Sequence, residues 1–135
     1  MSASALEMLD SNVLTYAFST DPRADIADGL LRKGCVISVQ ALNEFTNVAR
    51  RKMKMPWNDI REAVNAIRAL SGPVIPLEIE AHADAIAIAE RYQLSFFDAL
   101  MVAVGIKAGC SVLWSEDIQN GLLIEGKLRI RNPFQ

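Results

Sequence analysis

Hydrophobic and polar residues follow two different periods along this chain, and the period separates helices from strands. Residues 95–105 form the most apolar of the long helical candidates, with apolar side chains at nearly every position, as expected of a helix buried on most sides. Residues 39–53 instead carry one apolar stripe, which is typical of a helix with one buried face. Short apolar runs of strand-forming residues, such as 35–38 and 111–114, predict buried strands.

Strands and helices alternate from one end of the chain to the other. The strands are expected at residues 6–9, 35–38, 74–77, 111–114 and 128–131. The helices are expected at residues 12–18, 21–33, 39–53, 57–70, 78–92 and 95–109. This order predicts an α/β fold with a parallel sheet and helices on both faces. With 135 residues and no linker or internal repeat, the chain is expected to form one domain over residues 1–135.

Composition narrows the range of partners. Hydrophobic residues make up 51% of the chain and charged residues 22%, which indicates a globular rather than a disordered protein. The net charge of −2 gives no overall basic field for a nucleic acid. A polyanionic partner would therefore require a local basic patch or a bound metal ion.

The cysteines and the N-terminal segment indicate a cytoplasmic protein. Cys35 and Cys110 lie far apart and match no zinc-binding or redox spacing, so both are expected to be buried free thiols. No positively charged segment with a following apolar run marks a signal peptide at the start. No apolar run approaches the ~20 residues needed to span a bilayer, so no membrane partner is expected.

Several catalytic motifs are absent from the sequence. Neither the glycine-rich dinucleotide motif nor the phosphate-binding P-loop motif occurs. The chain has one histidine, His82, inside a predicted helix, and it has no G-x-S-x-G motif, so a serine or cysteine triad is not supported. The remaining candidates for chemistry are carboxylates.

Four carboxylates are expected at one edge of the sheet. Asp10 and Asp117 follow predicted strands, Glu44 lies on the helix after the second strand, and Asp98 stands near the start of the buried helix. In open α/β sheets, ligands bind beyond the carboxyl ends of the strands. Oxygen ligands without His or Cys suit Mg²⁺ or Mn²⁺. Such an ion would offset a repulsion of about 4 kcal/mol per carboxylate pair at ~4 Å and an effective dielectric of ~20.

Each of these acids also has a purely structural interpretation. Asp10 and Asp117 could cap the segments that follow them. Ser95 and Asp98 fit a capping box, in which Asp98 bonds back to the backbone of Ser95. Glu44 could lie in solvent at the border of its helix's apolar stripe. Taken together, the four acids favour a metal-dependent phosphoryl-transfer site, because such an ion activates water and stabilises charge on a phosphoryl group.

The sequence around these acids resembles the PIN-domain ribonucleases, with motifs in order over essentially the whole chain. The motifs are MLDSNVLTYA at 8–17, SVQALNEF at 38–45, SFFDAL at 95–100, LWSEDIQNG at 113–121 and the closing NPF at 132–134. The match is similar in detail to the VapC-type toxins of bacterial toxin–antitoxin pairs. The resemblance implies a three-layer α/β/α sandwich with a small, mostly parallel, twisted sheet.

The resemblance also implies roles for individual residues. The metal-binding and catalytic acids would be Asp10, Glu44, Asp98 and Asp117. Asn12 and Ser115 would support them through hydrogen bonds. Glu116 adjoins Asp117, but the family's acid in this motif corresponds to Asp117, so Glu116 is placed outside the set.

The implied activity is hydrolysis of RNA phosphodiesters with one or two Mg²⁺ or Mn²⁺ ions. The resemblance implies single-stranded or loop RNA as substrate, with transfer RNA or ribosomal RNA as the usual targets, a cognate antitoxin that covers the site, and a homodimer. Arg50, Arg51 and Lys52 are candidate RNA-binding residues, although cations also suit the end of a helix.

For some other side chains, the sequence does not decide between a contact with a partner and a place in the core or at the surface. Phe18, Met53, Met55 and Trp57 could form an apolar groove for a partner helix or belong to the core. Arg129 and Arg131 alternate with apolar residues, so they are expected on one solvent-facing side of the last strand.

Three rival functions follow from the same residues. The segment from Asp10 to Thr15 approaches the opening motif of haloacid-dehalogenase-type phosphatases, but Asn12 stands where that family has its second acid. A PIN-like binding module without catalysis would not need all four acids. A PIN nuclease of RNA processing, outside any toxin–antitoxin pair, would keep them.

Overall fold

Residues 6–135 are described by a computed structural model of the protein. The elements follow the order β1 (Glu7–Leu9), α1 (Ser11–Ala17), α2 (Ala24–Arg32), β2 (Ile37–Ser38), α3 (Val39–Arg51), α4 (Trp57–Leu70), β3 (Val74–Ile75), α5 (Ile79–Tyr92), α6 (Phe96–Lys107), β4 (Val112–Trp114), β5 (Leu123–Ile124) and β6 (Leu128–Arg131). The predicted alternation of strands and helices is confirmed, and β5 is an addition to it.

The strands form a four-stranded sheet in the order β1-β4-β6-β5 and a two-stranded sheet of β2 and β3. An isolated parallel bridge between Met8 and Val36 joins the two sheets. The pairs β1–β4, β4–β6 and β2–β3 are parallel, and β5–β6 is antiparallel. The mostly parallel sheet expected from the sequence is therefore confirmed.

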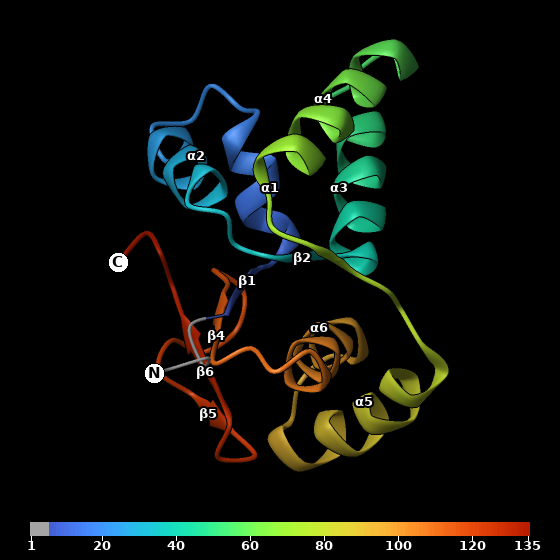
Figure 1. The fold of residues 1–135 in the computed structure, drawn as a ribbon, viewed down its shortest axis with the longest axis vertical. Coiled ribbons are helices and arrows are strands. Elements are labelled where there is room, and N and C mark those ends of the chain that lie inside the picture. The colour runs from blue at the N-terminus through green and yellow to red at the C-terminus, as the bar shows by residue number, and fades with distance from the viewer. Residues whose placement is uncertain (1–5) are drawn as a thin grey trace.

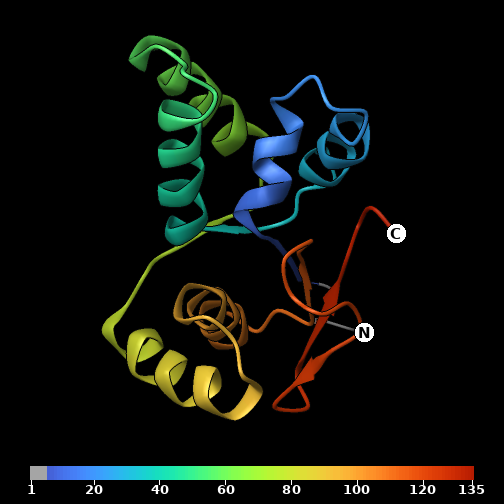
Figure 2. The ribbon, with the colours of Figure 1, turned by 180° about the vertical axis from the view of Figure 1, so that it is seen from behind.

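Helices cover both sides of the strands. In Figures 1 and 2, α1 to α4 gather on one side of β1 and β2, while α5 and α6 lie on the other. Helices α3 and α4 form a hairpin that extends away from the sheet (Figure 2). The arrangement is the α/β/α layering that the sequence predicted.

Helix α6 is the most buried of the helices because it lies between the sheet and α5. It contacts β2, β4 and β6 on one side and α5 on the other, and all residues from Ala99 to Gly105 are buried. A Cβ atom at Gly105 would lie 3.0 Å from Cε of Met8, so glycine lets β1 approach the helix closely. The continuous apolar run in the sequence therefore reflects burial on several sides.

The antiparallel strand β5 (Leu123–Ile124) was not predicted from the sequence. Its hairpin with β6 turns at Glu125 and Gly126, which have φ angles of 54° and 65°. Positive φ at both central residues is the signature of the tight hairpin turns that match strand twist.

Both cysteines, Cys35 and Cys110, are buried and free, as predicted. Arg131 is exposed, whereas Arg129 is half-buried and donates a hydrogen bond to the carbonyl of Gly121 at 2.8 Å. None of the helices within residues 6–135 combines the length and the apolar composition needed to cross a membrane.

Candidate active site

The parallel pairing of β1 with β4 sets the position of the first and last acidic segments. Leu9 is paired with Trp114 at the carboxyl ends of the two strands. The backbone N–H of Asp10 then donates to the carbonyl of Trp114 at 3.0 Å. Asp10 and the segment that begins at Ser115 therefore leave the sheet side by side.

Asp10 is the most buried of the predicted acids, with 3% of its surface exposed. Its carboxylate accepts hydrogen bonds of 2.7 Å from the backbone N–H of Ser11 and 2.7 Å from the hydroxyl of Ser115. The first of these bonds caps α1, so the capping interpretation is also observed. Burial raises the pKa of Asp10 to about 7; the two hydrogen bonds oppose the rise, and the charges of Glu44 and Asp98 add to it.

Glu44 reaches the site from the second turn of α3. The hydroxyl of Ser38 caps this helix by accepting from the N–H of Ala41 at 3.0 Å, and the buried Phe45 holds its inner face. The carboxylate of Glu44 accepts from the hydroxyl of Ser11 at 2.7 Å and from the amide of Gln40 at 3.0 Å. Glu44 is thus half-buried and held by neutral donors.

Asp98 lies in the first turn of α6. The hydroxyl of Ser95 accepts from the backbone N–H of Asp98 at 3.3 Å and caps the helix. Burial raises the pKa of Asp98, a hydrogen bond with the Ser95 side chain opposes the rise, and the charges of Asp117 and Glu44 add to it. The residue therefore combines the predicted helix-capping position with electrostatic proximity to two other acids.

Asn12 and Ser115 connect Asp10 with Asp117 through hydrogen bonds. The amide of Asn12 donates to Oδ2 of Asp117 at 3.1 Å and to Oδ2 of Asp10 at 3.3 Å. The hydroxyl of Ser115 donates to Asp10 and accepts from the backbone N–H of Asp117 at 3.1 Å. Both predicted supporting residues therefore contact the acids.

Asp10, Glu44, Asp98 and Asp117, called the acid cluster below, carry negative charge without a cationic partner. Within residues 6–135, none of the four forms an ion pair with Lys, Arg or His. By contrast, the neighbouring Glu116 forms an ion pair with Arg23 at 2.8 Å. Because like charges gathered in a half-buried site repel, the acid cluster favours a cation.

The chemistry of the donor atoms fits a hard divalent cation, since all of them are oxygens. In the described part of the chain, no three acidic, histidine or cysteine side chains are drawn together closely enough to enclose a metal ion. Mg²⁺ usually keeps several waters and takes one or two carboxylates directly. An open arrangement of hydrogen-bonded acids therefore still suits a hydrated ion.

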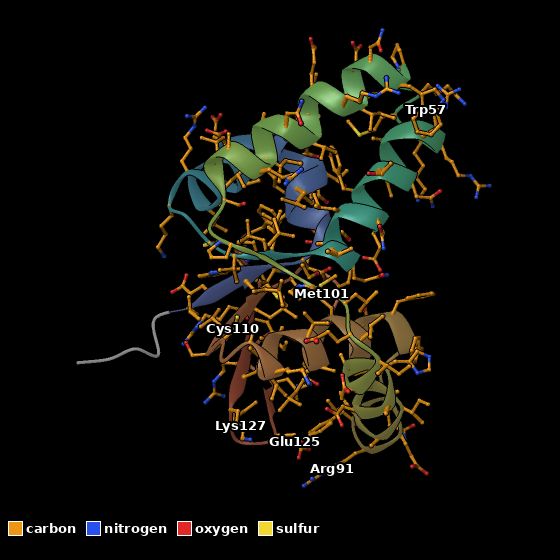
Figure 3. All side chains as sticks on the ribbon, turned by 45° about the vertical axis from the view of Figure 1, so that its right-hand side comes forward. Trp57, Arg91, Met101, Cys110, Glu125 and Lys127 are labelled. Carbon is orange, nitrogen blue, oxygen red and sulfur yellow. The ribbon has the colours of Figure 1, made fainter. Side chains whose placement is uncertain are left out.

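The basic residues Arg50, Arg51 and Lys52 lie apart from the acid cluster, at the end of α3. Arg51 is seven residues beyond Glu44, which corresponds to about 10 Å along a helix. The guanidinium of Arg50 stacks on the Trp57 ring at 4.7 Å, while Arg51 and Lys52 are exposed. Figure 3 shows Trp57 at the outer end of the α3–α4 hairpin.

The four candidates for a partner groove divide between core and surface. Phe18, Met53 and Met55 are half-buried and pack against the core. Trp57 has 52% of its surface exposed. The core interpretation therefore describes three of these side chains, and Trp57 alone among the four remains available at the surface.

Sequence reasoning missed the residues that hold Glu44 and Glu116. Gln40 stands four residues before Glu44, a spacing that places both on one helix face and offered a usable signal. Ser11 is adjacent to Asp10, but its contact with Glu44 spans 33 positions and has no sequence signature. The same is true of the contact between Arg23 and Glu116, which spans 93 positions.

Comparisons with known proteins identify a matching family and structures of similar fold. The model of the PIN domain family matches residues 8–119. A toxin–antitoxin complex from Klebsiella pneumoniae superposes with a TM-score of 0.71 at 18% identity, over 94% of this chain and 97% of that chain.

Two further structures are similar. VapC20 of Mycobacterium tuberculosis, described as a sarcin–ricin-loop-cleaving toxin, gives a TM-score of 0.68 at 18% identity over 82% of this chain and 91% of that chain. VapBC2 of Rickettsia felis, bound to a DNA fragment from its promoter, gives 0.68 at 20% identity over 94% of this chain and 98% of that chain. No curated protein matches the sequence.

Proposed function

The chain belongs to the PIN domain family, and from this premise we propose that it is a metal-dependent endoribonuclease that acts as the toxin of a toxin–antitoxin pair. The observation that carries the proposal is the acid cluster. Four carboxylates from the end of β1, from α3, from α6 and from the segment after β4 interact electrostatically and have no cationic partner among the described residues. Like charges held near one another in a partly buried site cost free energy, and a bound cation would offset that cost.

Asp10, Glu44, Asp98 and Asp117 would hold Mg²⁺ or Mn²⁺, with Asp10 and Asp117 oriented by Asn12 and Ser115. When bound, such an ion lowers the pKa of a coordinated water and stabilises charge on a phosphoryl oxygen. In the hydrolysis, an oxygen of water bonds to phosphorus and the bond from phosphorus to the leaving ribose oxygen breaks. The hydrogen bonds from Ser11 and Gln40 keep Glu44 directed at the cluster.

The end of the α3–α4 hairpin supports an RNA substrate. Residues 50–61 contain five Lys or Arg and one Asp, a net charge of +4, whereas the whole chain carries −2, so the remainder carries −6. Arg50, Arg51 and Lys52 would contact phosphates, and the exposed ring of Trp57 offers a surface on which an unpaired base can stack. The similarity to a toxin described as cleaving the sarcin–ricin loop also favours a loop or single strand of ribosomal or transfer RNA.

Two protein partners are proposed on the same basis. The similarity to toxin–antitoxin complexes supports a cognate antitoxin, for which Trp57 is an available contact.

For a homodimer, the exposed apolar side chains of Ile79, Ile86 and Phe97 offer contact area, with 74%, 56% and 59% of their surfaces exposed. Such side chains are typical of interfaces. Sedimentation of the wild type and of Ile86→Asp tests this, because a dimer through this surface should dissociate in the variant.

The enzymatic proposal is tested by incubating a labelled single-stranded RNA and a stem-loop RNA with the protein and Mn²⁺. Cleavage is expected with Mn²⁺, and neither EDTA-treated protein nor Asp10→Ala should cleave. Asp84→Ala, which alters an exposed acid on α5, is the matched control and should cleave normally. Cleavage by Asp10→Ala in EDTA would contradict the proposal, and so would the absence of calorimetric heat on adding Mn²⁺ to the wild type.

A further inference from the structure

Next to the acid cluster, two side chains hold Glu116 in a fixed position outside it. The hydroxyl of Tyr16 donates to Oε2 of Glu116 at 2.7 Å, and the guanidinium of Arg23 donates to Oε1 at 2.8 Å. Arg23 also forms two hydrogen bonds of 2.9 Å with the carboxylate of Asp21 and stacks on the Tyr16 ring at 4.4 Å. Phe134 packs edge-on against the same ring at 4.9 Å. Each oxygen of Glu116 therefore has its own donor, and the side chain is fixed.

The backbone of Glu116 connects this arrangement to the acids. Its N–H donates to Oδ1 of Asn12 at 3.3 Å. An amide whose oxygen is held in this way must point its nitrogen in the opposite direction, and that nitrogen donates to Asp10 and Asp117. The position of Glu116 thus determines which way the Asn12 amide faces.

Glu116 and its neighbour Asp117 differ in whether an arginine compensates their negative charge. Arg23 compensates the charge of Glu116, whereas Asp117 has no ion pair among the described residues. A free Glu116 would be a further acid able to turn toward the cluster. The contacts with Tyr16 and Arg23 therefore keep one acid of the Ser115–Asp117 segment outside the cluster while the other faces it.

We propose that Tyr16, Arg23 and Glu116 are positioning residues for metal binding. They hold the 115–117 segment and the Asn12 amide in the conformation that presents Asp117 and Asp10 to a divalent ion. The inference rests on the proposed function, because it assigns these three residues a role at the same acid cluster. Hydrogen-bond partners of metal-binding side chains typically change metal affinity by about 10- to 100-fold.

The chain contains a matched control for this proposal. Tyr92, Arg91 and Glu125 form a second group of the same three residue types: the Tyr92 hydroxyl donates to Glu125 at 3.0 Å, and Arg91 donates to the same oxygen at 3.0 Å. Arg91 also lies over the Tyr92 ring at 5.4 Å. Within residues 6–135, no hydrogen bond or ion pair joins this group to the acid cluster, and Figure 3 shows Arg91 and Glu125 at the end of the molecule opposite Trp57. It has the same three residue types and no connection to Asn12, but both donors reach one oxygen and the Tyr92 hydroxyl also accepts from the backbone N–H of Glu125 at 2.9 Å.

The experiment compares Tyr16→Phe with Tyr92→Phe, since each substitution removes one hydroxyl and no charge. Titration calorimetry with MnCl₂ should show about tenfold weaker binding for Tyr16→Phe and no change for Tyr92→Phe. For RNA cleavage by the Tyr16→Phe enzyme, kcat should fall while KM for RNA stays unchanged. Equal Mn²⁺ affinity in the wild type and Tyr16→Phe, or an equal loss in both tyrosine variants, would overturn the proposal.

Two substitutions at Glu116 separate positioning from simple charge. Glu116→Gln and Glu116→Ala both remove the negative charge, but glutamine keeps an acceptor for Tyr16. Tighter Mn²⁺ binding by the Gln variant than by the Ala variant is expected. Equal binding by the two would mean that only the charge of Glu116 matters, and the proposal would fail.

A metal-free measurement distinguishes this proposal from the proposed function. In apo protein, the NMR signal of the Asn12 side-chain amide should shift in Tyr16→Phe and stay in place in Tyr92→Phe. If the wild type binds no Mn²⁺ but this signal shifts as expected, the proposed function fails while the connection from Tyr16 to Asn12 stands. An unmoved signal overturns the connection itself.

Discussion

The hydroxyl of Ser115 donates a 2.7 Å hydrogen bond to Oδ2 of Asp10 across 105 positions of the chain. Both residues are buried, with 0% and 3% of their surfaces exposed. They meet because β1 and β4 pair in parallel and end at the same level. A neutral hydroxyl orients the Asp10 carboxylate but does not compensate its charge, so Asp10 stays available to a cation.

Replacing Asp10 by asparagine should separate activity from stability. Asp10→Asn should lose at least ~100-fold in RNA cleavage, because a neutral amide lacks the negative charge that attracts a divalent cation. At pH 8 in EDTA, its free energy of unfolding should equal or exceed that of the wild type, because the variant buries no unpaired charge. Cleavage assays and urea denaturation measure the two effects. A large loss of stability at pH 8 would show that the Asp10 charge contributes to the fold.

The contribution of Asp10 to the stability of the metal-free protein should fall as the pH rises from about 4 to about 7. The native pKa of Asp10 is raised to about 7 from 3.8, so the folded state binds the proton more tightly than the unfolded chain. The stabilisation is complete below the unfolded pKa and is lost as the pH passes through the folded pKa. Urea denaturation in EDTA across this range measures the slope. Asp10→Asn should have a smaller slope, and an identical slope in both proteins would contradict the assignment.

The affinity for Mn²⁺ should show the opposite dependence on pH. Because a carboxylate must lose its proton to bind the ion, affinity should rise with pH until Asp10 is deprotonated. Calorimetry in buffers of different ionisation enthalpy should also detect proton release near pH 6. Affinity that does not vary with pH would mean that Asp10 is already charged in the folded protein.

The two interpretations of Asp98 can be tested independently. Asp98→Asn should weaken Mn²⁺ binding by about tenfold but leave the helix cap in place, because the cap uses the backbone N–H of Asp98. Ser95→Ala should instead cost about 1 kcal/mol of stability through loss of the cap. Calorimetry and thermal denaturation distinguish them. If Asp98→Asn kept full metal affinity and cleavage, the Asp98 carboxylate would have no part in the metal site.

Ser11 should be needed for catalysis through Glu44. Removing its hydroxyl in Ser11→Ala leaves Glu44 without its 2.7 Å donor, and kcat is expected to fall about tenfold. Ser71→Ala is the control, because the Ser71 hydroxyl bonds the backbone carbonyl of Gly72 just after α4. The variants are compared by single-turnover cleavage with saturating Mn²⁺. Equal rates for both would exclude a role for Ser11 in holding Glu44.

The basic end of α3 should determine the salt dependence of RNA binding. Arg51→Ala or Lys52→Ala should weaken binding to the inactive Asp10→Asn protein and reduce the slope of log Kd against log salt by about 1 for each phosphate contact. Lys127→Ala, at the opposite end from Trp57 in Figure 3, should leave the slope unchanged. Fluorescence anisotropy from 50 to 300 mM salt (roughly the range in which counterion release is measured) gives the slopes. Equal slopes in all variants would place the RNA elsewhere.

Local chemistry along the chain determined the order of elements and the placement of the acids. The capping hydroxyls of Ser38 and Ser95 and the apolar run of α6 act over a few residues, and the structure has the helices where these signals predict them. Parallel strands bring their carboxyl ends to one edge, so acids that follow strands could be expected to meet. The meeting of Asp10 with Ser115 follows from that rule.

Only the tertiary structure decided which hydrogen-bond donors contact each acid. Ser11 reaches Glu44, and Tyr16 and Arg23 reach Glu116, because α1, α3 and the loop after β4 pack at particular angles. Those angles are set by the volumes of many buried side chains together, so no local pattern encodes them. The motif distinguishes Glu116 from Asp117, but only the structure shows that Glu116 is paired with Arg23 and that Asp117 accepts from Asn12.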